Sequence, residues 1–407
     1  MGPLNGLRVV EVGDRGEVAG KLLADAGADV IKVEPPAGAA SRRVGPYVGD
    51  RPDLNASLHF AYWNTNKRGV TLDLDQPDGV AIWRRLVAGA DVVIDAGPPG
   101  HLDGGGGAYA DCVRDGLIWC AITPFGLEGP WRDFATNDLV SMALGGPMMS
   151  NGYDDHDLPP VRPDGGHSLA MGGEYAAAAV LIALYQRDRT GNGNLIDVSI
   201  HEAVSCTTEG AFPNWEYNRR LVQRQTGRHS APTPTLPWQM RCSDGDYVVL
   251  MGGGFPRDER TWTALIEWME PSGANAAIRD LKYSRAEMGD EVREQVMRAV
   301  HRFVESMPAE EAYRGGQGRH LPYGYVRRPE QNLDDPHWRE RGFFVETALP
   351  GHEKPVLYPA VPYRFSATPM EMRRRAPLLG EHNFEVYSGG LGYTPEQLIV
   401  LAQASVI

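Results

Sequence analysis

Cysteine is scarce in this 407-residue chain: only Cys112, Cys120, Cys206 and Cys242 occur, far apart and without a CxxC pair. Disulfide frameworks and structural zinc sites rely on closely spaced cysteines. We therefore expect neither a disulfide scaffold nor a bound metal.

Basic residues are outnumbered by acidic ones, with 40 Lys and Arg against 53 Asp and Glu and a formal net charge of −13. Proteins that bind nucleic acid neutralise its phosphates with clustered cations. The composition therefore argues against a nucleic-acid partner. A small anionic ligand remains compatible, because it needs only a local group of Arg or Lys.

Long hydrophobic runs are also lacking. The longest apolar stretch, residues 169–185, is shorter than a typical membrane span and contains Glu174, so it predicts a buried helix. Residues 1–10 lack the charged-then-apolar pattern of a signal peptide. We expect a cytoplasmic protein that makes no membrane contact.

The first part of the chain alternates short β-type runs with helical patterns. The strand signals lie at residues 7–12, 29–33, 69–73, 91–95 and 117–123, separated by helical segments such as 18–28 and 77–87. Alternation of this kind predicts an α/β fold with a parallel sheet covered on both faces.

The second half suggests a separate, smaller α/β unit between two proline-rich stretches, 219–237 and 350–377. We predict a large Rossmann-like domain and a small α/β domain. The expected boundaries are a large domain at 1–218, a linker at 219–237, a small domain at 238–345, and a return linker with a C-terminal segment completing the large domain at 346–407.

Six segments in a fixed order resemble family III CoA-transferases, the group that includes formyl-CoA transferase, carnitine CoA-transferase and α-methylacyl-CoA racemase. The segments are PLNGLRVV at 3–10, LLADAGADVIKVEPP at 22–36, NTNKRGVTLD at 64–73, FGLEGP at 125–130, RTGNG at 189–193 and LGEH at 379–382. The resemblance implies the family's interlocked dimer, whose active sites lie where domains of different subunits meet.

The resemblance also implies that the ligand is coenzyme A or an acyl-CoA, with a carboxylic acid as the second substrate. Phosphates favour helix N-termini, backbone N–H groups and Arg or Lys. The family pattern points to a CoA-binding set made of Arg15, Gly16, Lys32, Arg42, Asn66, Lys67 and Arg68.

The catalytic carboxylate of these transferases is an aspartate that attacks the acyl-CoA thioester. Its position in the resembling segment is Leu169, which has no nucleophilic atom. Three nearby residues are alternatives: His167, Asp164 and Glu174. Each also has an ordinary structural interpretation, as a loop residue, a turn residue or a polar helix contact.

The racemases of the family use a histidine and an aspartate as acid and base. The histidine position is Asn137 here, and Asp138 remains, where it is expected to cap the helix that it begins. The family's Asn-Phe pair that contacts CoA is replaced by Ala96 and Gly97. The scaffold motifs are thus retained while the functional positions differ.

Three functions follow from this pattern. The chain is expected to be the nucleophile-lacking subunit of a heteromeric, benzylsuccinate-type CoA-transferase, paired with a homologous family III subunit. The alternatives are a stand-alone acyl-CoA lyase, hydratase, isomerase or thioesterase that uses other acid and base residues, and a non-catalytic acyl-CoA binder.

Overall fold

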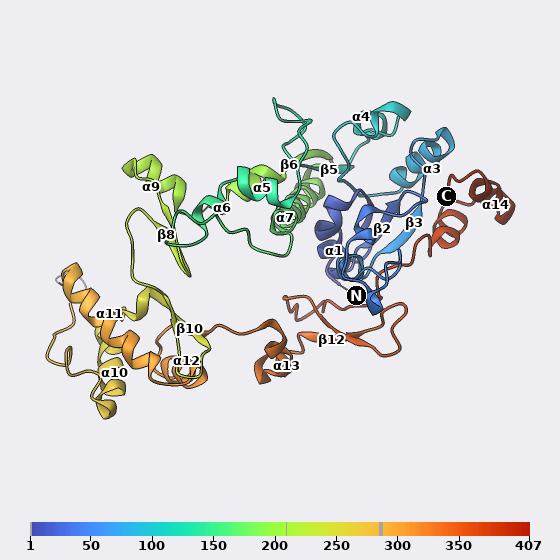
Figure 1. Cartoon of the computed structure of the whole chain (residues 1–407). Coiled ribbons are helices and arrows are strands. Elements are labelled where there is room, and N and C mark those ends of the chain that lie inside the picture. Colours follow the sequence, from blue (N-terminus) through green and yellow to red (C-terminus); the bar gives the residue numbers. More distant parts are fainter. Residues whose placement is uncertain (1, 209, 285–287) are drawn as a thin grey trace. The chain divides into compact units, whose positions relative to one another are not determined.

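A six-stranded parallel sheet forms the centre of the larger of two units (Figure 1). The computed structural model describes residues 2–208, 210–284 and 288–407. The strands of the sheet are β1 (Arg8–Val12), β2 (Asp29–Glu34), β3 (Arg68–Thr71), β4 (Val92–Asp95), β5 (Ile118–Thr123) and β6 (Asn194–Ser199). They lie in the order β3-β2-β1-β4-β5-β6, which confirms the predicted α/β class and the parallel sheet.

The sheet is buried because its strands consist mainly of β-branched residues and are covered by helices. All six residues of β5 are buried, as are four of the five in β1. Trp83 and Trp119 pack edge to face in the core with ring centroids 6.2 Å apart. The helices of this part are α1 (Glu17–Asp25), α2 (Leu58–Trp63), α3 (Pro77–Ala88), α4 (Tyr109–Cys112), α5 (Asp138–Leu144), α7 (His167–Thr190) and α8 (Ile200–Ser205).

The strand order creates a switch point between β1 and β4. The chain runs outward from β1 through β2 to β3 and then returns to β4 on the other side of β1. Connections leaving the carboxyl ends of β1 and β4 therefore diverge. In open α/β sheets the resulting crevice is where ligands bind.

Helix α7 is the longest described helix, and it packs along α1 and α8 and over β5 and β6. By length and composition alone, α7 among the described helices is apolar enough to cross a membrane. Its opposite face is exposed, with Tyr175, Leu181, Ile182 and Tyr185 on the surface. The prediction of a buried helix is therefore correct for one face only.

Residues 335–407 return to the larger unit. They contain α13 (Pro336–Arg341), the hairpin of β12 (Phe344–Thr347) and β13 (Val356–Pro359), a π-helix at Phe384–Gly390 and α14 (Pro395–Gln403). Buried Tyr387 donates to the carbonyl of Thr71 at 2.8 Å, which fastens this segment to β3. Thr394 caps α14 in a capping box with Gln397.

The smaller unit has its own apolar core and an antiparallel sheet in the order β11-β10-β9. Trp262, Leu265 and Phe303 from its helices pack against Val248 and Leu250 of the sheet. Its elements are α6 (Pro147–Ser150), α9 (Ala211–Asn218), β7 (Gln223–Gln225), β8 (Arg228–Ala231), β9 (Gln239–Arg241), β10 (Tyr247–Leu250), α10 (Glu259–Met269), α11 (Asp290–Glu305), α12 (Ala309–Gln317) and β11 (Tyr323–Tyr325).

The division between the units differs from the expected boundaries. The smaller unit comprises 146–162 and 208–334, and the larger unit comprises 1–145, 163–207 and 335–407. Residues 146–162 join the smaller unit because Arg224 donates to the carbonyls of His156 and Leu158, at 2.9 and 2.7 Å, and Arg228 pairs with Asp154 at 2.7 Å. Spacing along the sequence does not reveal such long-range pairs.

Candidate active site

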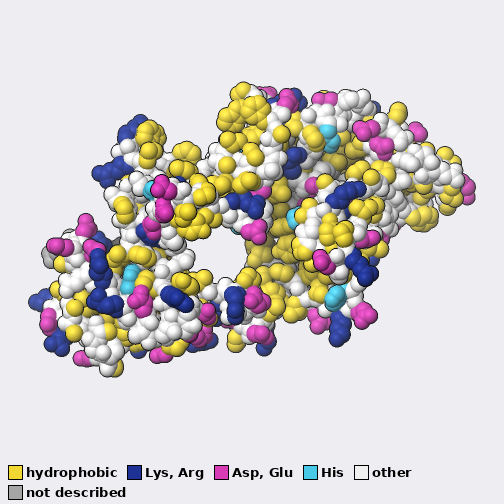
Figure 2. All heavy atoms as spheres, viewed as in Figure 1, with side chains coloured by type: hydrophobic (Ala, Val, Ile, Leu, Met, Phe, Trp, Pro, Cys, Tyr) yellow, Lys and Arg dark blue, Asp and Glu magenta, His cyan; other side chains and the backbone are white. Residues whose placement is uncertain are grey.

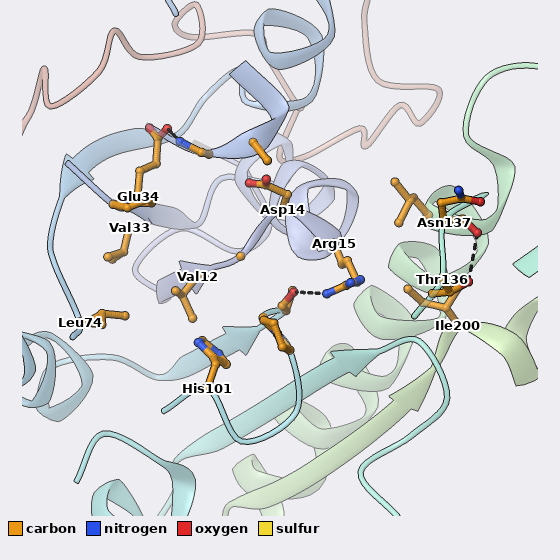
Figure 3. A pocket seen from close by; sticks show the side chains of 18 of the residues that line it. Val12, Asp14, Arg15, Val33, Glu34, Leu74, His101, Thr136, Asn137 and Ile200 are labelled. Atoms are coloured by element: carbon orange, nitrogen blue, oxygen red, sulfur yellow. Dashed lines mark hydrogen bonds between the residues drawn. The ribbon is translucent and has the colours of Figure 1, made fainter. Parts of the chain in front are cut away.

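A crevice of about 570 Å³ opens at the carboxyl ends of the sheet strands, at the switch point between β1 and β4 (Figure 3). Every residue that lines it belongs to the larger unit. The lining comprises Val12–Arg15, Val33–Pro35, Ala39, Ala40, Leu72–Asp75, Ala96–Pro98, His101, Thr136–Asp138, Ser141, Ser168, Leu169 and Ile200.

Arg15 is the single Lys or Arg side chain that the described part of the chain brings to this lining. It lies in the short 3-10 helix Asp14–Gly16 that follows β1, and its Nη1 is 3.5 Å from the carbonyl of Ala96. Burial lowers the pKa of Arg15, and neighbouring Asp14 opposes that shift. The guanidinium still carries its charge at any physiological pH.

The acidic side chains among the described residues of the lining are Asp14, Glu34, Asp73, Asp75 and Asp138, in a wall that is otherwise mainly apolar. Asp14 accepts from the backbone N–H of Ser41 at 3.1 Å, and Glu34 is neutralised by an arginine behind it. Asp73 and Asp75 lie on the loop that follows β3, where the carboxylate of Asp73 accepts from the Asp75 N–H at 3.0 Å. A ligand rich in phosphate would therefore find few cations in this crevice.

Leu169 lies in the first turn of α7 and lines the crevice. The N–H and the hydroxyl of its neighbour Ser168 both donate to Oδ1 of Asp138, at 2.9 and 2.8 Å. Asp138 thus stabilises the start of α7. The cap of α5 is Asn137, whose side chain accepts from the N–H of Val140, so the expected capping role of Asp138 was wrong.

The other three residues considered as replacements for the nucleophile do not line the crevice. His167 and Glu174 are exposed on α7, and Asp164 is exposed in the bend before it. Five positions separate Leu169 from Glu174, more than one helical turn, so the two side chains point in different directions. Among the residues considered, only Asp138 brings a carboxylate to this part of the crevice.

The lysines expected to bind CoA phosphates lie inside the larger unit. The ammonium group of Lys67 is completely buried, and it donates to Glu11, to Asn64 and to the carbonyl of Glu17 at 2.9–3.1 Å. An ammonium group has three N–H bonds, so none remains for a phosphate. Burial lowers the pKa of Lys67, and Glu11 opposes that shift.

Lys32 is held in the same buried group of charges. Its Nζ lies 3.1 Å from Glu11, 3.0 Å from Glu17 and 3.7 Å from Asp14. Burial alone would lower the pKa of Lys32, but these carboxylates raise it overall. The three acidic neighbours therefore keep this lysine charged inside the protein.

The remaining members of the expected binding set are also engaged internally. Arg42 is buried and makes two bonds to Glu34 at 2.6 and 2.8 Å, Asn66 donates to Asp25 at 2.7 Å, and Arg68 pairs with Asp29 at 2.6 Å. Gly16 is buried against Ile94, where an added Cβ would approach Cγ2 to 2.7 Å. On the face shown in Figure 2, the exposed Lys and Arg side chains are interspersed with Asp and Glu.

Sequence reasoning missed His101, which lines the crevice and hydrogen-bonds to Asp95 across 2.7 Å. The signal available in the sequence was an aspartate at the end of a strand followed six residues later by a histidine. That spacing is not specific enough to single out this pair among the 11 histidines of the chain.

The fold agrees with comparisons to known proteins. The sequence model of CoA-transferase family III matches residues 4–383, so the chain belongs to this family. It is therefore a CoA-transferase or a subunit of one, and CoA thioesters are the substrates of its family.

Three proteins illustrate the similarity within the family. The chain is 33% identical over 391 residues to a protein of Thauera aromatica named succinyl-CoA:(R)-benzylsuccinate CoA-transferase subunit BbsE, covering 93% of this chain and 92% of that protein. It is 29% identical to a succinyl-CoA–D-citramalate CoA-transferase of Chloroflexus aurantiacus, and the match covers 100% of this chain and 98% of that protein. A crystal structure of a CAIB/BAIF family protein from Brucella suis matches with a TM-score of 0.79 at 26% identity, covering 95% and 99%.

Proposed function

We propose that this chain is the subunit without a nucleophile in a heteromeric family III CoA-transferase, and that a homologous subunit supplies the aspartate. The observation that carries the proposal is Leu169: an alkyl side chain lines the crevice on the first turn of α7, where the family resemblance implies an aspartate. The relative from Thauera aromatica, itself named as a subunit, supports a heteromer.

In the proposed complex, the partner's aspartate attacks the thioester carbonyl of the donor acyl-CoA. The acyl group moves to the carboxylate as a mixed anhydride and CoA leaves as a thiolate, which then attacks the aspartyl carbonyl and releases the donor acid. The acceptor acid repeats the sequence in reverse. Leu169 can form none of these bonds, so this chain contributes assembly and substrate recognition.

The exposed apolar face of α7 also supports a partner subunit. Tyr175, Leu181, Ile182 and Tyr185 recur at helical spacing on one side of the helix and are 45–70% exposed. Contiguous exposed apolar surface of this kind marks protein–protein contacts. We propose that a second family III chain covers this face in an interlocked dimer.

The succinyl-CoA relatives suggest the substrate class. Donors and acceptors named for them are dicarboxylates or their CoA esters, so we propose that the complex exchanges CoA between succinate and a second, larger acid. An aromatic acid is the favoured acceptor, because Trp131 and Phe134 stack with centroids 6.1 Å apart and half-exposed rings, just before crevice residue Thr136.

The decisive experiment co-expresses this chain with a homologous family III chain that carries the aspartate, and measures CoA transfer from succinyl-CoA to benzylsuccinate. Activity is expected only when both chains are present. Replacing the partner's aspartate by asparagine should abolish turnover. Leu169→Asn in this chain should leave at least about half of the transfer rate of the wild-type complex. A fully active homomer of this chain alone would refute the proposal.

The alternative is that this chain is an enzyme by itself, and assays of the purified chain without a partner distinguish the two functions. Asp138 is its best candidate base, because it lies in the crevice beside Leu169. Purified alone, the chain would then convert an acyl-CoA, and Asp138→Asn would remove that turnover. Binding of acyl-CoA without turnover, alone or with any partner, would favour the non-catalytic binder.

A further inference from the structure

A histidine and an aspartate form an ordered pair at the carboxyl end of β4. Nε2 of His101 lies 2.7 Å from Oδ1 of Asp95, and Oδ2 of Asp95 accepts from Nε1 of Trp119 at 3.3 Å. Trp119 is only 1% exposed and belongs to the core. The carboxylate is therefore fixed from behind, and it fixes the imidazole in turn.

The ring of His101 occupies space that almost any side chain at residue 97 would fill. A Cβ added at Gly97 would lie 2.3 Å from Nε2 and 2.5 Å from two ring carbons. Gly97 does not have a positive φ, so its backbone does not require glycine. The absence of a side chain at residue 97 serves to admit the imidazole.

Two cavities share His101 in their walls. One is the crevice, and the other is a cavity of about 310 Å³ bounded by α3 and the glycine-rich loop 104–107; Leu74 and Asp75 also line both. The side chain of His101 is 22% exposed. Within the described part of the chain, its Nδ1 has no hydrogen-bond partner.

The protonation pattern of the ring follows from its partner. An ionised carboxylate only accepts hydrogen bonds, so the proton lies on Nε2 and the neutral ring presents an acceptor at Nδ1. A protonated ring presents a donor there instead. Nδ1 can therefore bind either a hydroxyl or amino group, or a phosphate, and a CoA nucleotide carries all of these.

We propose that His101, positioned by Asp95, is a ligand-binding residue that hydrogen-bonds the nucleotide half of a CoA ester. The proposal rests on the proposed function, which supplies CoA as the ligand. Figure 3 shows His101 beside Val12 and Leu74, on the opposite side of Arg15 from Asn137 and Ile200. His101 thus lies away from the α5 and α7 end of the crevice, where the acyl group would react.

The composition of the crevice gives this hydrogen bond its importance. Lys32, Lys67 and Arg42 are engaged inside the protein, which leaves Arg15 as the one permanent cation among the described residues of the lining. Asp75 lines the same two cavities as His101 and adds negative charge there. Because Arg15 is the one permanent cation among the described lining residues, the loss of one further favourable contact with the ligand should be measurable.

The test measures the dissociation constant of coenzyme A itself by calorimetry, using the full-length chain in complex with its partner. His101→Phe is expected to raise the constant about fivefold to tenfold, the effect of one lost hydrogen bond to a polar ligand. Asp95→Asn should raise it about twofold to fivefold by releasing the ring. His352→Gln, a change to an exposed histidine outside the crevice, should leave it unchanged.

A second readout is independent of any folding defect. In wild-type protein labelled with ¹⁵N-histidine, saturating coenzyme A should shift the Nδ1 resonance of His101 and leave that of His352 in place. No shift, or a His101→Phe variant that keeps both its melting temperature and its affinity, would overturn the inference. If the wild-type complex transfers CoA normally but coenzyme A does not shift the His101 resonance, the role of His101 is overturned and the proposed function stands. If the affinity for coenzyme A depends on His101 but the complex has no transferase activity, the proposed function is overturned and the role of His101 stands.

Discussion

Two regions of the larger unit arrange their charges in opposite ways. In the interior beneath β1 and β2, Lys32, Lys67 and Arg42 each contact at least one carboxylate and are almost inaccessible to water. In the crevice at the carboxyl ends of the strands, carboxylates line the wall and Arg15 is the one permanent cation among the described residues. Basic residues placed by motif near a ligand site can therefore belong to the scaffold.

The difference also separates stability from function. An internal ion pair costs desolvation, and removal of one partner leaves a buried charge uncompensated. A crevice side chain remains partly hydrated, so replacing it changes ligand affinity more than folding. Substitutions in the two regions should consequently affect different measurements.

The largest effect is expected for Lys67→Met. The change leaves Glu11 buried with Lys32 as its remaining cation and should destabilise the fold by about 3–5 kcal/mol in urea unfolding. Lys354→Met, at an exposed position of the same unit, is the control and should change stability by less than about 0.5 kcal/mol. If the unfolding curves of the two variants coincide, the buried charges do not stabilise the fold, and the proposed difference between the interior and the crevice is wrong.

Gly97→Ala should produce a smaller change of a different kind. The new methyl group must displace the His101 ring, at a cost of about 1–3 kcal/mol for overpacking, and CoA affinity should fall as in His101→Phe. Gly104→Ala is the matched control in the same loop region, because an added Cβ there meets nothing within 4 Å. Equal CoA affinities for the two variants would contradict the role assigned to residue 97.

Asp138→Ala removes the acceptor for two hydrogen bonds at the start of α7. A loss of about 1 kcal/mol is expected, the usual magnitude for a missing helix cap. Asp138→Asn retains a carbonyl oxygen and should recover most of that loss. Thermal melting of both variants measures the difference, and identical melting temperatures would show that Asp138 does not support α7.

The smallest effect on stability is expected for Asp75→Lys, on the exposed rim of the crevice. Unfolding free energy should change by no more than about 0.5 kcal/mol. The affinity for coenzyme A should rise about twofold to fivefold, because a screened surface charge contributes little more. Calorimetry at low and high salt checks the sign: the gain should shrink as salt is added, and a gain that persists would point to a different cause.

The sequence predicted the sheet because most of its strands are short runs rich in buried β-branched residues between helical patterns. It also placed Leu169 on the first turn of the long helix, which the structure confirms. It assigned Lys32, Arg42 and Lys67 to the ligand because a linear pattern does not show burial. It failed to assign residues 146–162 to the smaller unit because Arg224 and Arg228 reach them across about 70 positions of sequence.

The amino-acid sequence by itself determined the class of fold and the family, since both depend on local pattern. Only the tertiary structure decided which charges line the crevice. Burial and pairing are properties of the folded chain, and they joined Asp95, Gly97 and His101 into one site while they withdrew Lys67 from it.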